Sequence, residues 1–389
     1  MKAVVFKHRN KIKVEKVPDP VIQDETDAII RITATAICGS DLHLYDKIVP
    51  GMKRGDILGH EPMGIVEEVG SEVRHISPGD RVVIPFNISC GHCFMCEAGL
   101  YSQCETTQNR QWRKGGSLFG YTHLYGGIPG GQAELLRVPQ AQFGPIKIHN
   151  GAPDTRLVLL ADVLPTAWQA VEYAQVPESG TLAIFGLGPI GQAAVRIARH
   201  RGIERVIAVD KVPERLSMAQ RHGAEVVDLK QVDDPVDVIL DKTHGRGADS
   251  AIDAVGFEAS GSKADSVLQT VKLQPDKLNA LMSAIASIRR GGTLSIAGVY
   301  LGYIPIFHIG DLFDRQLTIR MGQANVRKWS DEILPLIEEE DRLGVDDLVT
   351  HVLPLEEAKH AYEIFQKKED GAIKIVLQPG RPNETQKKR

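Results

Sequence analysis

The stretch TLAIFGLGPIG, residues 181–191, decides the fold of this 389-residue chain. A short apolar segment, Thr181–Phe185, runs into a glycine-rich turn, and the helix-length segment Gln192–Arg201 follows it. The alternation continues, with further strands predicted at Arg205–Asp210, Glu225–Asp228, Asp249–Val255 and Thr293–Val299. Strands that alternate with helical segments predict an α/β domain, in which helices cover both faces of a parallel sheet.

The turn carries three glycines in the pattern Gly-x-Gly-x-x-Gly. Gly186 suits a tight turn, Gly188 lets a diphosphate approach the backbone, and Gly191 lets the helix pack close to the strand. Pro189 and Ile190 lie between the last two glycines and open the helix, whose N-terminal amide groups attract phosphate. Because the pattern follows a strand and precedes a helix, it predicts a dinucleotide-binding site.

The next predicted strand ends in an acidic residue. Asp210 stands nineteen residues after Gly191, where a carboxylate can bind the ribose hydroxyls of an adenosine. A carboxylate repels the 2′-phosphate of NADP, so the sequence favours NAD, although Lys211 weakens this preference. The alternative is a glycine-rich turn without a ligand, in which Asp210 caps the helix that begins near Pro213.

The segments on either side of this domain have a different texture. Residues 1–150 contain frequent glycine and proline and few long helical patterns, which predicts a mostly-β domain. Its predicted strands are Ala28–Ala36, Gly64–Val69 and Asp80–Pro85. The C-terminal part carries predicted strands at Gln316–Met321 and Ile373–Gln378, a helix near Asp331–Glu339, and a polar, disordered tail at 380–389.

Composition excludes several classes of function. With 42% hydrophobic and 25% charged residues and a net charge of -4, the chain has neither the basic surface of a nucleic-acid binder nor that of a protein on an anionic membrane. The N-terminus lacks the apolar core of a signal peptide, and no apolar run reaches the length of a membrane span. Clustered cysteines indicate metal binding rather than disulfides, so we expect a reducing, cytoplasmic compartment.

Four of the five cysteines lie within fifteen residues. They are Cys90, Cys93, Cys96 and Cys104. Thiolates at this spacing can close a tetrahedral zinc site that leaves no open position, which predicts a structural zinc ion. We expect His92 to be a solvent-facing neighbour rather than a ligand. The alternative is a loop that contains four reduced cysteines by chance.

Two further motifs are CGSDLH at residues 38–43 and GHE at residues 59–61. Together with the four cysteines and the glycine pattern with its acid, they resemble the zinc-containing branch of the medium-chain dehydrogenase/reductase superfamily over nearly the whole chain. The resemblance implies a GroES-like, mostly-β catalytic domain at 1–162, with a zinc lobe near 90–104, and a doubly wound Rossmann domain at 163–306. Residues 307–389 would return to the catalytic domain. The implied activity is hydride transfer between an alcohol carbon and NAD, with two zinc ions per chain.

The same resemblance makes Cys38 and His60 ligands of a catalytic zinc. The third ligand of the family stands just before the cofactor domain, where this chain has the sequence LADVLPTA at 160–167, so Asp162 is the candidate. An aspartate oxygen is an acceptable zinc ligand, and three protein ligands leave a fourth position for substrate. Glu61 would be a neighbouring group or a transient ligand. Alternatively, Asp162 caps the helix that contains Thr166–Val171.

Oxidation of an alcohol releases a proton, which needs a route away from the site. The resemblance implies that Ser40 bonds the substrate oxygen and passes the proton toward His43, which titrates near neutral pH. Asp41 is placed to orient His60. Thr166 would lie near the nicotinamide. The alternative for Ser40 and His43 is that both are ordinary polar residues of a loop.

Within the superfamily, three segments look most like the glutathione-independent formaldehyde dehydrogenases: Gly120-Tyr121, Gly130–Glu134 and Asp162–Thr166. In that subgroup an insertion covers the adenine end of NAD and retains it, and the interruption at 256–277 is its counterpart. Phe86 would form an apolar wall of the substrate pocket, or belong to the core.

The expected substrate is therefore formaldehyde or another small alcohol or aldehyde. Two alternatives stay open, a polyol dehydrogenase acting on sorbitol-like substrates and a protein that binds NAD without turnover. The resemblance also implies a homo-oligomer built partly through the cofactor domains, with a tetramer favoured over a dimer.

Overall fold

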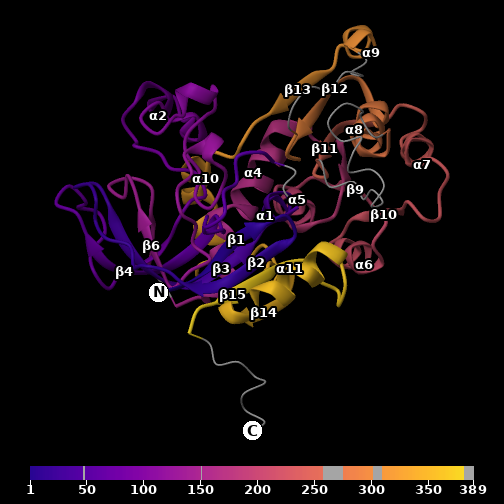
Figure 1. Cartoon of the computed structure of the whole chain (residues 1–389). Helices are drawn as coiled ribbons and strands as arrows, with labels where there is room; N and C mark the ends of the chain where they lie inside the picture. Colours follow the sequence, from indigo (N-terminus) through magenta and orange to yellow (C-terminus); the bar gives the residue numbers. More distant parts are fainter. Residues whose placement is uncertain (47–48, 150, 257–274, 301–308, 381–389) are drawn as a thin grey trace. The chain divides into compact units, whose positions relative to one another are not determined.

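The computed structural model describes the chain except for residues 47–48, 150, 257–274, 301–308 and 381–389. The chain divides into two compact units (Figure 1), the first formed by Met1–Pro165 with Ala324–Arg389 and the second by Thr166–Gln323. Nearly all of the interruption expected at 256–277 and of the tail expected at 380–389 lies outside the described residues, so both stay predictions.

The second unit is built on one six-stranded parallel sheet. Its strands are β8 (Thr181–Phe185), β9 (Arg205–Asp210), β10 (Glu225–Asp228), β11 (Ala248–Asp253), β12 (Ile288–Ile296) and β13 (Thr318–Met321). They are ordered β10-β9-β8-β11-β12-β13, and every neighbouring pair is parallel. Counted along the chain this order is 3-2-1-4-5-6, that of a doubly wound Rossmann sheet. The predicted parallel α/β domain is confirmed.

Helices connect these strands and bury their apolar residues against the sheet. They are α5 (Pro189–His200), α6 (Pro213–Arg221), α7 (Pro235–Lys242), α8 (Pro275–Ser287) and α9 (Ile309–Asp314). The first three begin with proline, whose missing N–H leaves no helical hydrogen bond unmade at that position. Ile239 of α7 and Leu281 of α8 join Phe185 and Val209 of the sheet in one core cluster.

The largest differences from the prediction in this unit are its C-terminal boundary and the start of one strand. The second unit extends to Gln323 rather than to residue 306, because β13 pairs in parallel with β12 and adds the sixth strand. The strand expected at Thr293–Val299 is β12, which begins at Ile288 and ends at Ile296. Its early start follows from a first pairing between Ile288 and Ala248 of β11.

The first unit contains a mostly antiparallel seven-stranded sheet and a two-stranded hairpin. The sheet is formed by β3 (Ala28–Ile37), β4 (Glu61–Val69), β5 (Arg81–Val83), β6 (Leu135–Val138), β7 (Ile146–Ile148), β14 (His351–Pro354) and β15 (Ile375–Gln378), and the hairpin by β1 (Lys2–His8) and β2 (Lys11–Lys16). The order is β14-β15-β3-β4-β5-β7, with β6 paired to β3. This mostly-β architecture agrees with the prediction for the N-terminal part.

The register of this sheet brings three distant segments together. Ile37 pairs with Ile375 of β15, and Ala36 pairs with Glu61 at the start of β4. Cys38, which follows β3, therefore lies close to both Glu61 and the residue before β15. The C-terminal segment is thus part of the first unit's sheet and reaches the same end of it as the two N-terminal motifs.

The helices of the first unit are short. They are α1 (Gly39–Tyr45), α2 (Phe94–Glu97), α3 (Asp154–Leu157), α10 (Val326–Ile333) and α11 (Ala358–Lys367), and α4 (Val163–Ala174) crosses the boundary into the second unit. The helix predicted at Asp331–Glu339 was misplaced, because Pro335 lacks the N–H that would continue α10 and the chain forms a 3₁₀ turn there. No helix in the described part of the chain has the length and apolarity needed to cross a membrane.

Candidate functional site

Three side chains converge at one end of the first unit's sheet. Cys38 follows β3 and occupies the N-cap position of α1, His60 directly precedes β4, and Asp162 directly precedes α4. Asp162 Oδ2 lies 3.5 Å from Cys38 Sγ and 3.4 Å from His60 Nε2. With a Glu61 oxygen, the ligand atoms of these residues all lie within 4.8 Å of one another. The structure thus brings together the predicted catalytic-metal ligands.

The charges of this cluster favour a bound cation. Burial raises the pKa of the Cys38 thiol to about 11, and the Asp162 and Glu61 carboxylates add to the rise. Burial opposes protonation of His60, but Asp41 and Asp162 raise its pKa well above the ordinary value. The Cys38 thiol and the Asp162 and Glu61 carboxyl groups therefore lie close together in a buried site. A thiolate, an imidazole and a carboxylate are ligand types of zinc, so the residues present fit this ion.

Asp41 fixes the orientation of two of these groups. Its Oδ1 accepts a hydrogen bond of 3.1 Å from His60 Nδ1, and its Oδ2 accepts one of 3.0 Å from the backbone N of Cys38. Since Nδ1 donates to Asp41, Nε2 is the ring nitrogen that faces Asp162 and would bind a metal. The expected contact between Asp41 and His60 is confirmed.

Ser40 and His43 both lie on α1. Ser40 Oγ is 3.2 Å from His60 Nε2, and His43 is buried one turn further along the helix. Both residues lie on a helix rather than in a loop, because α1 begins at Gly39, and their role stays a prediction. Their place beside Cys38 is compatible with the expected proton route.

Lys374 is a site residue that sequence reasoning missed. It directly precedes β15 and is fully buried, as is Glu61. Its Nζ lies 2.7 Å and 2.6 Å from the two Glu61 oxygens and donates a 3.0 Å hydrogen bond to the Ile37 carbonyl. A lysine inside the apolar segment IKIVL, residues 373–377, was the available signal, because buried lysines are almost always paired.

Two aromatic rings approach His60 edge-on. The ring centroid of Phe86 is 6.2 Å away at an interplanar angle of 77°, and that of Tyr121 is 6.3 Å away at 89°. Both residues are buried, at 8% and 7% exposure. Phe86 is therefore buried like a core residue and also lies next to His60. Gly120-Tyr121 was used only for the subgroup resemblance, and the sequence did not predict that Tyr121 lies beside His60.

The four cysteines of the lobe also converge. All are free thiols, and their sulfurs lie within 4.8 Å of one another, with Cys90–Cys96 at 4.0 Å and Cys93–Cys104 at 3.9 Å. Sulfurs of a tetrahedral site with metal–sulfur distances of about 2.3 Å lie about 3.8 Å apart, so the cluster fits zinc. Burial opposes ionisation of Cys93, but hydrogen bonds from backbone N–H groups lower its pKa to about 6. His92 is exposed, as expected.

The glycine-rich turn of the second unit forms an open cradle. Gly186 has φ +88°, a conformation that favours glycine. A Cβ on Gly191 would lie 1.9 Å from the Gly186 carbonyl oxygen, whereas one on Gly188 would have as its nearest atom Arg215 Nη1 at 3.8 Å. A side-chain methyl at position 188 would therefore clash with no atom of the described residues, so packing alone does not require glycine there. This fits the expected role of Gly188, which is to let a ligand come close to the backbone. Pro189 and Ile190 begin α5 directly behind it.

Two charged residues stand next to this cradle. Asp210 Oδ2 accepts a 2.6 Å hydrogen bond from the backbone N of Leu187, and Oδ1 accepts from the backbone N of Lys211 and of Val212. The N-cap of α6 is Val212, so the alternative of Asp210 as the cap is wrong. Arg215 is 5% exposed, and its Nε has no hydrogen-bond partner among the residues that the structure describes. A role for Arg215 was not predicted from the sequence, although a basic residue in the first turn of α6, shortly after Asp210, was visible.

Comparison with known proteins identifies the family. Residues 24–148 match the alcohol dehydrogenase GroES-like domain, and residues 189–272 match the zinc-binding dehydrogenase model. The zinc-type alcohol dehydrogenase-like protein AdhB of Bacillus subtilis (strain 168) is 43% identical over 382 residues, covering 97% of this chain and 100% of that protein. The chain belongs to the zinc-dependent medium-chain alcohol dehydrogenase family.

Two further relatives of this dehydrogenase bear on its fold and subgroup. The structure of the alcohol dehydrogenase TADH from Thermus sp. ATN1 has a TM-score of 0.83 and 34% identity, covering 97% of this chain and 100% of that one. The glutathione-independent formaldehyde dehydrogenase of Pseudomonas aeruginosa (strain LESB58) is 32% identical, and the alignment covers 97% of each chain. The predicted family, its GroES-like and Rossmann folds and its oxidoreductase class are confirmed, with zinc and a nicotinamide dinucleotide as the family's cofactors.

Matched alanine substitutions in the cradle of the dehydrogenase separate ligand binding from folding. We expect Gly188→Ala to weaken binding of the dinucleotide by about tenfold or more, because overpacking by one methyl costs about 1–3 kcal/mol. Its melting temperature should stay that of the parent. Gly191→Ala should instead lower the melting temperature, because its Cβ meets backbone. Calorimetric titration with NADH and thermal unfolding measure both; equal affinity in Gly188→Ala and parent contradicts the prediction.

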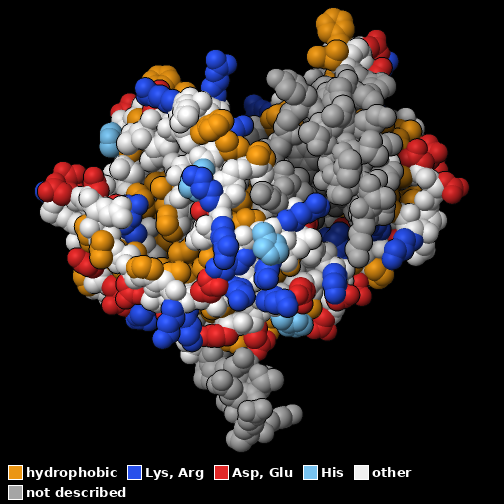
Figure 2. All heavy atoms as spheres, viewed as in Figure 1, with side chains coloured by type: hydrophobic (Ala, Val, Ile, Leu, Met, Phe, Trp, Pro, Cys, Tyr) orange, Lys and Arg blue, Asp and Glu red, His pale blue; other side chains and the backbone are white. Residues whose placement is uncertain are grey.

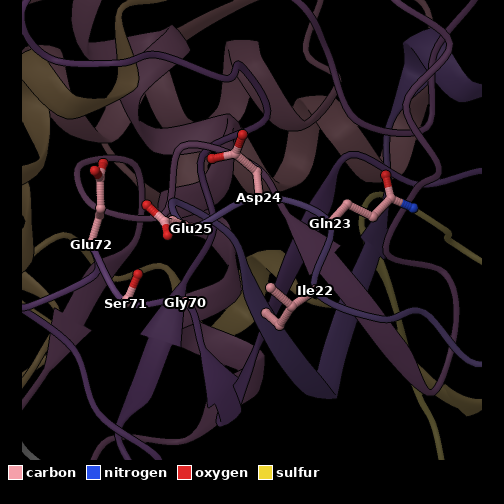
Figure 3. Close-up of a pocket in the computed structure, with 7 residues that line it drawn as sticks. All are labelled: Ile22, Gln23, Asp24, Glu25, Gly70, Ser71 and Glu72. Atoms are coloured by element: carbon pink, nitrogen blue, oxygen red, sulfur yellow. The ribbon is translucent and has the colours of Figure 1, made fainter.

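A hollow on the surface of the dehydrogenase's first unit lies apart from these residues. Figure 3 shows that Ile22–Glu25 and Gly70–Glu72 line it. Asp24, Glu25 and Glu72 contribute carboxylates, but none of the expected site residues is part of its lining. Clustered surface acids do not define a ligand, so we assign this hollow no role.

Proposed function

We propose that this dehydrogenase oxidises short alcohols or hydrated aldehydes, formaldehyde among them, with NAD and a zinc ion held by Cys38, His60 and Asp162. The observation that carries the proposal is the convergence of a thiol, an imidazole and a carboxylate within 4.8 Å. When bound, zinc supplies the Lewis acidity that makes a substrate hydroxyl more acidic, and NAD supplies the hydride acceptor. The four-cysteine lobe would hold a second, structural zinc.

The residues around the site would manage the proton that the reaction releases. Asp41 holds the proton on His60 Nδ1, so that Nε2 stays available as a ligand. Ser40 Oγ, close to that nitrogen, would accept the substrate proton and pass it toward His43 along α1. Glu61 is held by Lys374, whose ammonium group opposes the rise that burial causes in the pKa of this carboxyl.

The second unit supports NAD as the dinucleotide. The open backbone at Gly188 and the N-terminus of α5 would accept the diphosphate. Asp210 would bind the adenosine ribose and disfavour a 2′-phosphate. Arg215 is buried, its Nη1 lies beside the open position at Gly188 and its Nε has no partner among the described residues, so its guanidinium would also contact the dinucleotide. Thr166, on α4, stays the candidate for the nicotinamide end.

The surroundings of His60 favour a small substrate. Phe86 and Tyr121 place two aromatic rings against the imidazole, and the Phe86 ring and the carbon edges of Tyr121 offer no hydrogen bond to a chain of hydroxyl groups. The hydroxyl groups of a polyol would therefore lose their hydrogen bonds to water in this site without gaining hydrogen bonds to the protein. Similarity to a formaldehyde dehydrogenase at 32% identity points in the same direction.

A substrate panel tests the proposal. Purified protein with its metal content measured is supplied with formaldehyde, short primary and secondary alcohols, sorbitol and a non-substrate buffer, each with NAD and with NADP. We expect about two zinc ions per chain and reduction of NAD with a short alcohol or hydrated aldehyde. Turnover of sorbitol in preference to these would favour the polyol alternative. Cofactor binding without any turnover would favour the non-catalytic alternative.

We also propose that the chain forms a homo-oligomer through its second unit. Strand β13 is the edge of the six-stranded sheet, and Ile309, Phe313 and Met321 near it are 72%, 86% and 60% exposed. Figure 2 shows hydrophobic side chains exposed where α9 lies in Figure 1. Light scattering on the purified protein distinguishes the favoured tetramer from a dimer or monomer.

Reduced cysteines that hold zinc suit a cytoplasmic compartment.

A further inference from the structure

Two fully buried polar residues lie behind the candidate catalytic metal site. Gln132 lies three residues before β6, and Tyr362 lies on α11 in the C-terminal part of the first unit. The Tyr362 hydroxyl donates a 2.8 Å hydrogen bond to Gln132 Oε1. Gln132 Nε2 donates to Asp41 Oδ2 at 3.3 Å and to the Ala36 carbonyl at 3.5 Å. A chain of hydrogen bonds therefore runs from α11 to Asp41.

The partners of Gln132 determine how its amide is oriented. A carboxylate and a backbone carbonyl can only accept, so both must face the amide NH₂ group. The Tyr362 hydroxyl is the donor on the opposite side and must face Oε1. If the amide turned over, Oε1 would face the Asp41 carboxylate and two acceptors would oppose each other. The Tyr362 hydroxyl therefore holds Gln132 in the one orientation that donates to Asp41.

Asp41 distributes its two oxygens between different partners. Oδ1 accepts from His60 Nδ1, while Oδ2 accepts from Gln132 Nε2 and from the backbone N of Cys38. The Asp41 side chain has no exposure to solvent, so no water replaces a lost donor. A rotation of the Asp41 carboxylate would therefore move two candidate metal ligands together. It would shift His60 through the hydrogen bond to its imidazole and Cys38 through the hydrogen bond to its backbone N.

We propose that Tyr362 and Gln132 are positioning residues that fix Cys38 and His60 for the catalytic metal through Asp41. This inference rests on the proposed function, because it requires a metal at Cys38, His60 and Asp162. It assigns a role in metal binding to α11, a helix whose sequence contains none of the candidate ligands.

Cobalt substitution tests the inference. Protein with cobalt exchanged into the Cys38 site and zinc retained in the four-cysteine lobe is prepared for the parent, Tyr362→Phe and Gln132→Met. Loss of an outer partner of a metal ligand lowers metal affinity by about 10–100-fold. We expect release of cobalt to a chelator to be about tenfold faster in Gln132→Met and several-fold faster in Tyr362→Phe. The cobalt absorption bands should shift in both variants.

Tyr45→Phe is the matched control. Tyr45 is buried and its ring centroid lies 5.5 Å from that of Tyr362, but its hydroxyl makes no hydrogen bond to the described residues. We expect this variant to keep the parent's cobalt spectrum and release rate. It removes the same group from the other ring of this aromatic pair, so it corrects for a general loosening of the contact between Tyr45 on α1 and Tyr362 on α11.

The outcomes separate the inference from the function on which it rests. If the parent takes up metal only in the four-cysteine lobe, the proposed function fails and the inference fails with it. If the parent binds cobalt at Cys38 but both variants keep its spectrum and release rate, only the inference is overturned, even when their melting temperatures fall. Should Gln132→Met not fold, the comparison of Tyr362→Phe with Tyr45→Phe decides.

Discussion

Replacement of Cys38 by serine is expected to lower kcat/KM for alcohol oxidation by about 1,000-fold. Lewis-acid catalysis by a metal ion is worth several kcal/mol, and each 1.4 kcal/mol changes a rate tenfold. The thiolate is the anionic sulfur ligand of the candidate site, and a neutral serine hydroxyl replaces its charge with a dipole. The zinc content should fall from about two ions per chain to about one. Initial rates of NAD reduction and metal analysis on the same preparation measure both quantities.

The matched control for this variant is Cys93→Ser in the four-cysteine lobe. This substitution also removes one thiol from a metal cluster, but the cluster has no open position for a substrate. We expect it to lower the melting temperature, and to leave more activity per folded molecule than Cys38→Ser does. Parent-like kcat/KM in Cys38→Ser at full zinc content would show that the metal site proposed here is not the catalytic one.

The parts of the site that lie close together in sequence were predictable. The four lobe cysteines span fifteen residues, so their spacing alone predicts a zinc site, whereas the roles of Cys38 and Asp41 at the start of α1 were predicted from the family resemblance of the motif at 38–43. The strands of the second unit were predictable for a similar reason, because each buried strand is a continuous apolar run. The helix predicted near Asp331–Glu339 runs across Pro335, which was visible in the sequence and which marks the 3₁₀ turn that follows α10.

The parts that depend on long-range pairing could not be found this way. Lys374 reaches Glu61 only because β15 pairs with β3 in one particular register, and nothing in either segment fixes that register by itself. The hydrogen bond between Tyr362 and Gln132 joins residues 230 positions apart. Strand β13 likewise belongs to the second unit through its pairing with β12 rather than through its own composition.

The pairing of Lys374 with Glu61 leads to the second large prediction, a loss of stability in Lys374→Met. Both side chains have zero exposure, and the ammonium group lies within 2.7 Å of the carboxylate. Removal of one partner leaves a buried, uncompensated charge, which costs about 3–5 kcal/mol. Burial raises the pKa of Glu61 and Lys374 opposes that rise, so the variant must either keep an unpaired buried carboxylate or protonate Glu61, and both reduce stability. Urea unfolding of zinc-loaded protein measures the loss.

The double variant Glu61→Gln/Lys374→Met removes both charges and should recover a large part of the lost stability, because no buried charge remains. Lys2→Met controls for loss of an ordinary ion pair: Lys2 lies 2.6 Å from Glu356, with exposures of 44% and 34%, and its loss should change the unfolding free energy by less than about 1 kcal/mol. If Lys374→Met were no less stable than Lys2→Met, Glu61 would not be an ionised partner of Lys374. If the double variant recovered nothing, the stabilisation would come from the packing of the lysine chain and its bond to Ile37 rather than from the ion pair.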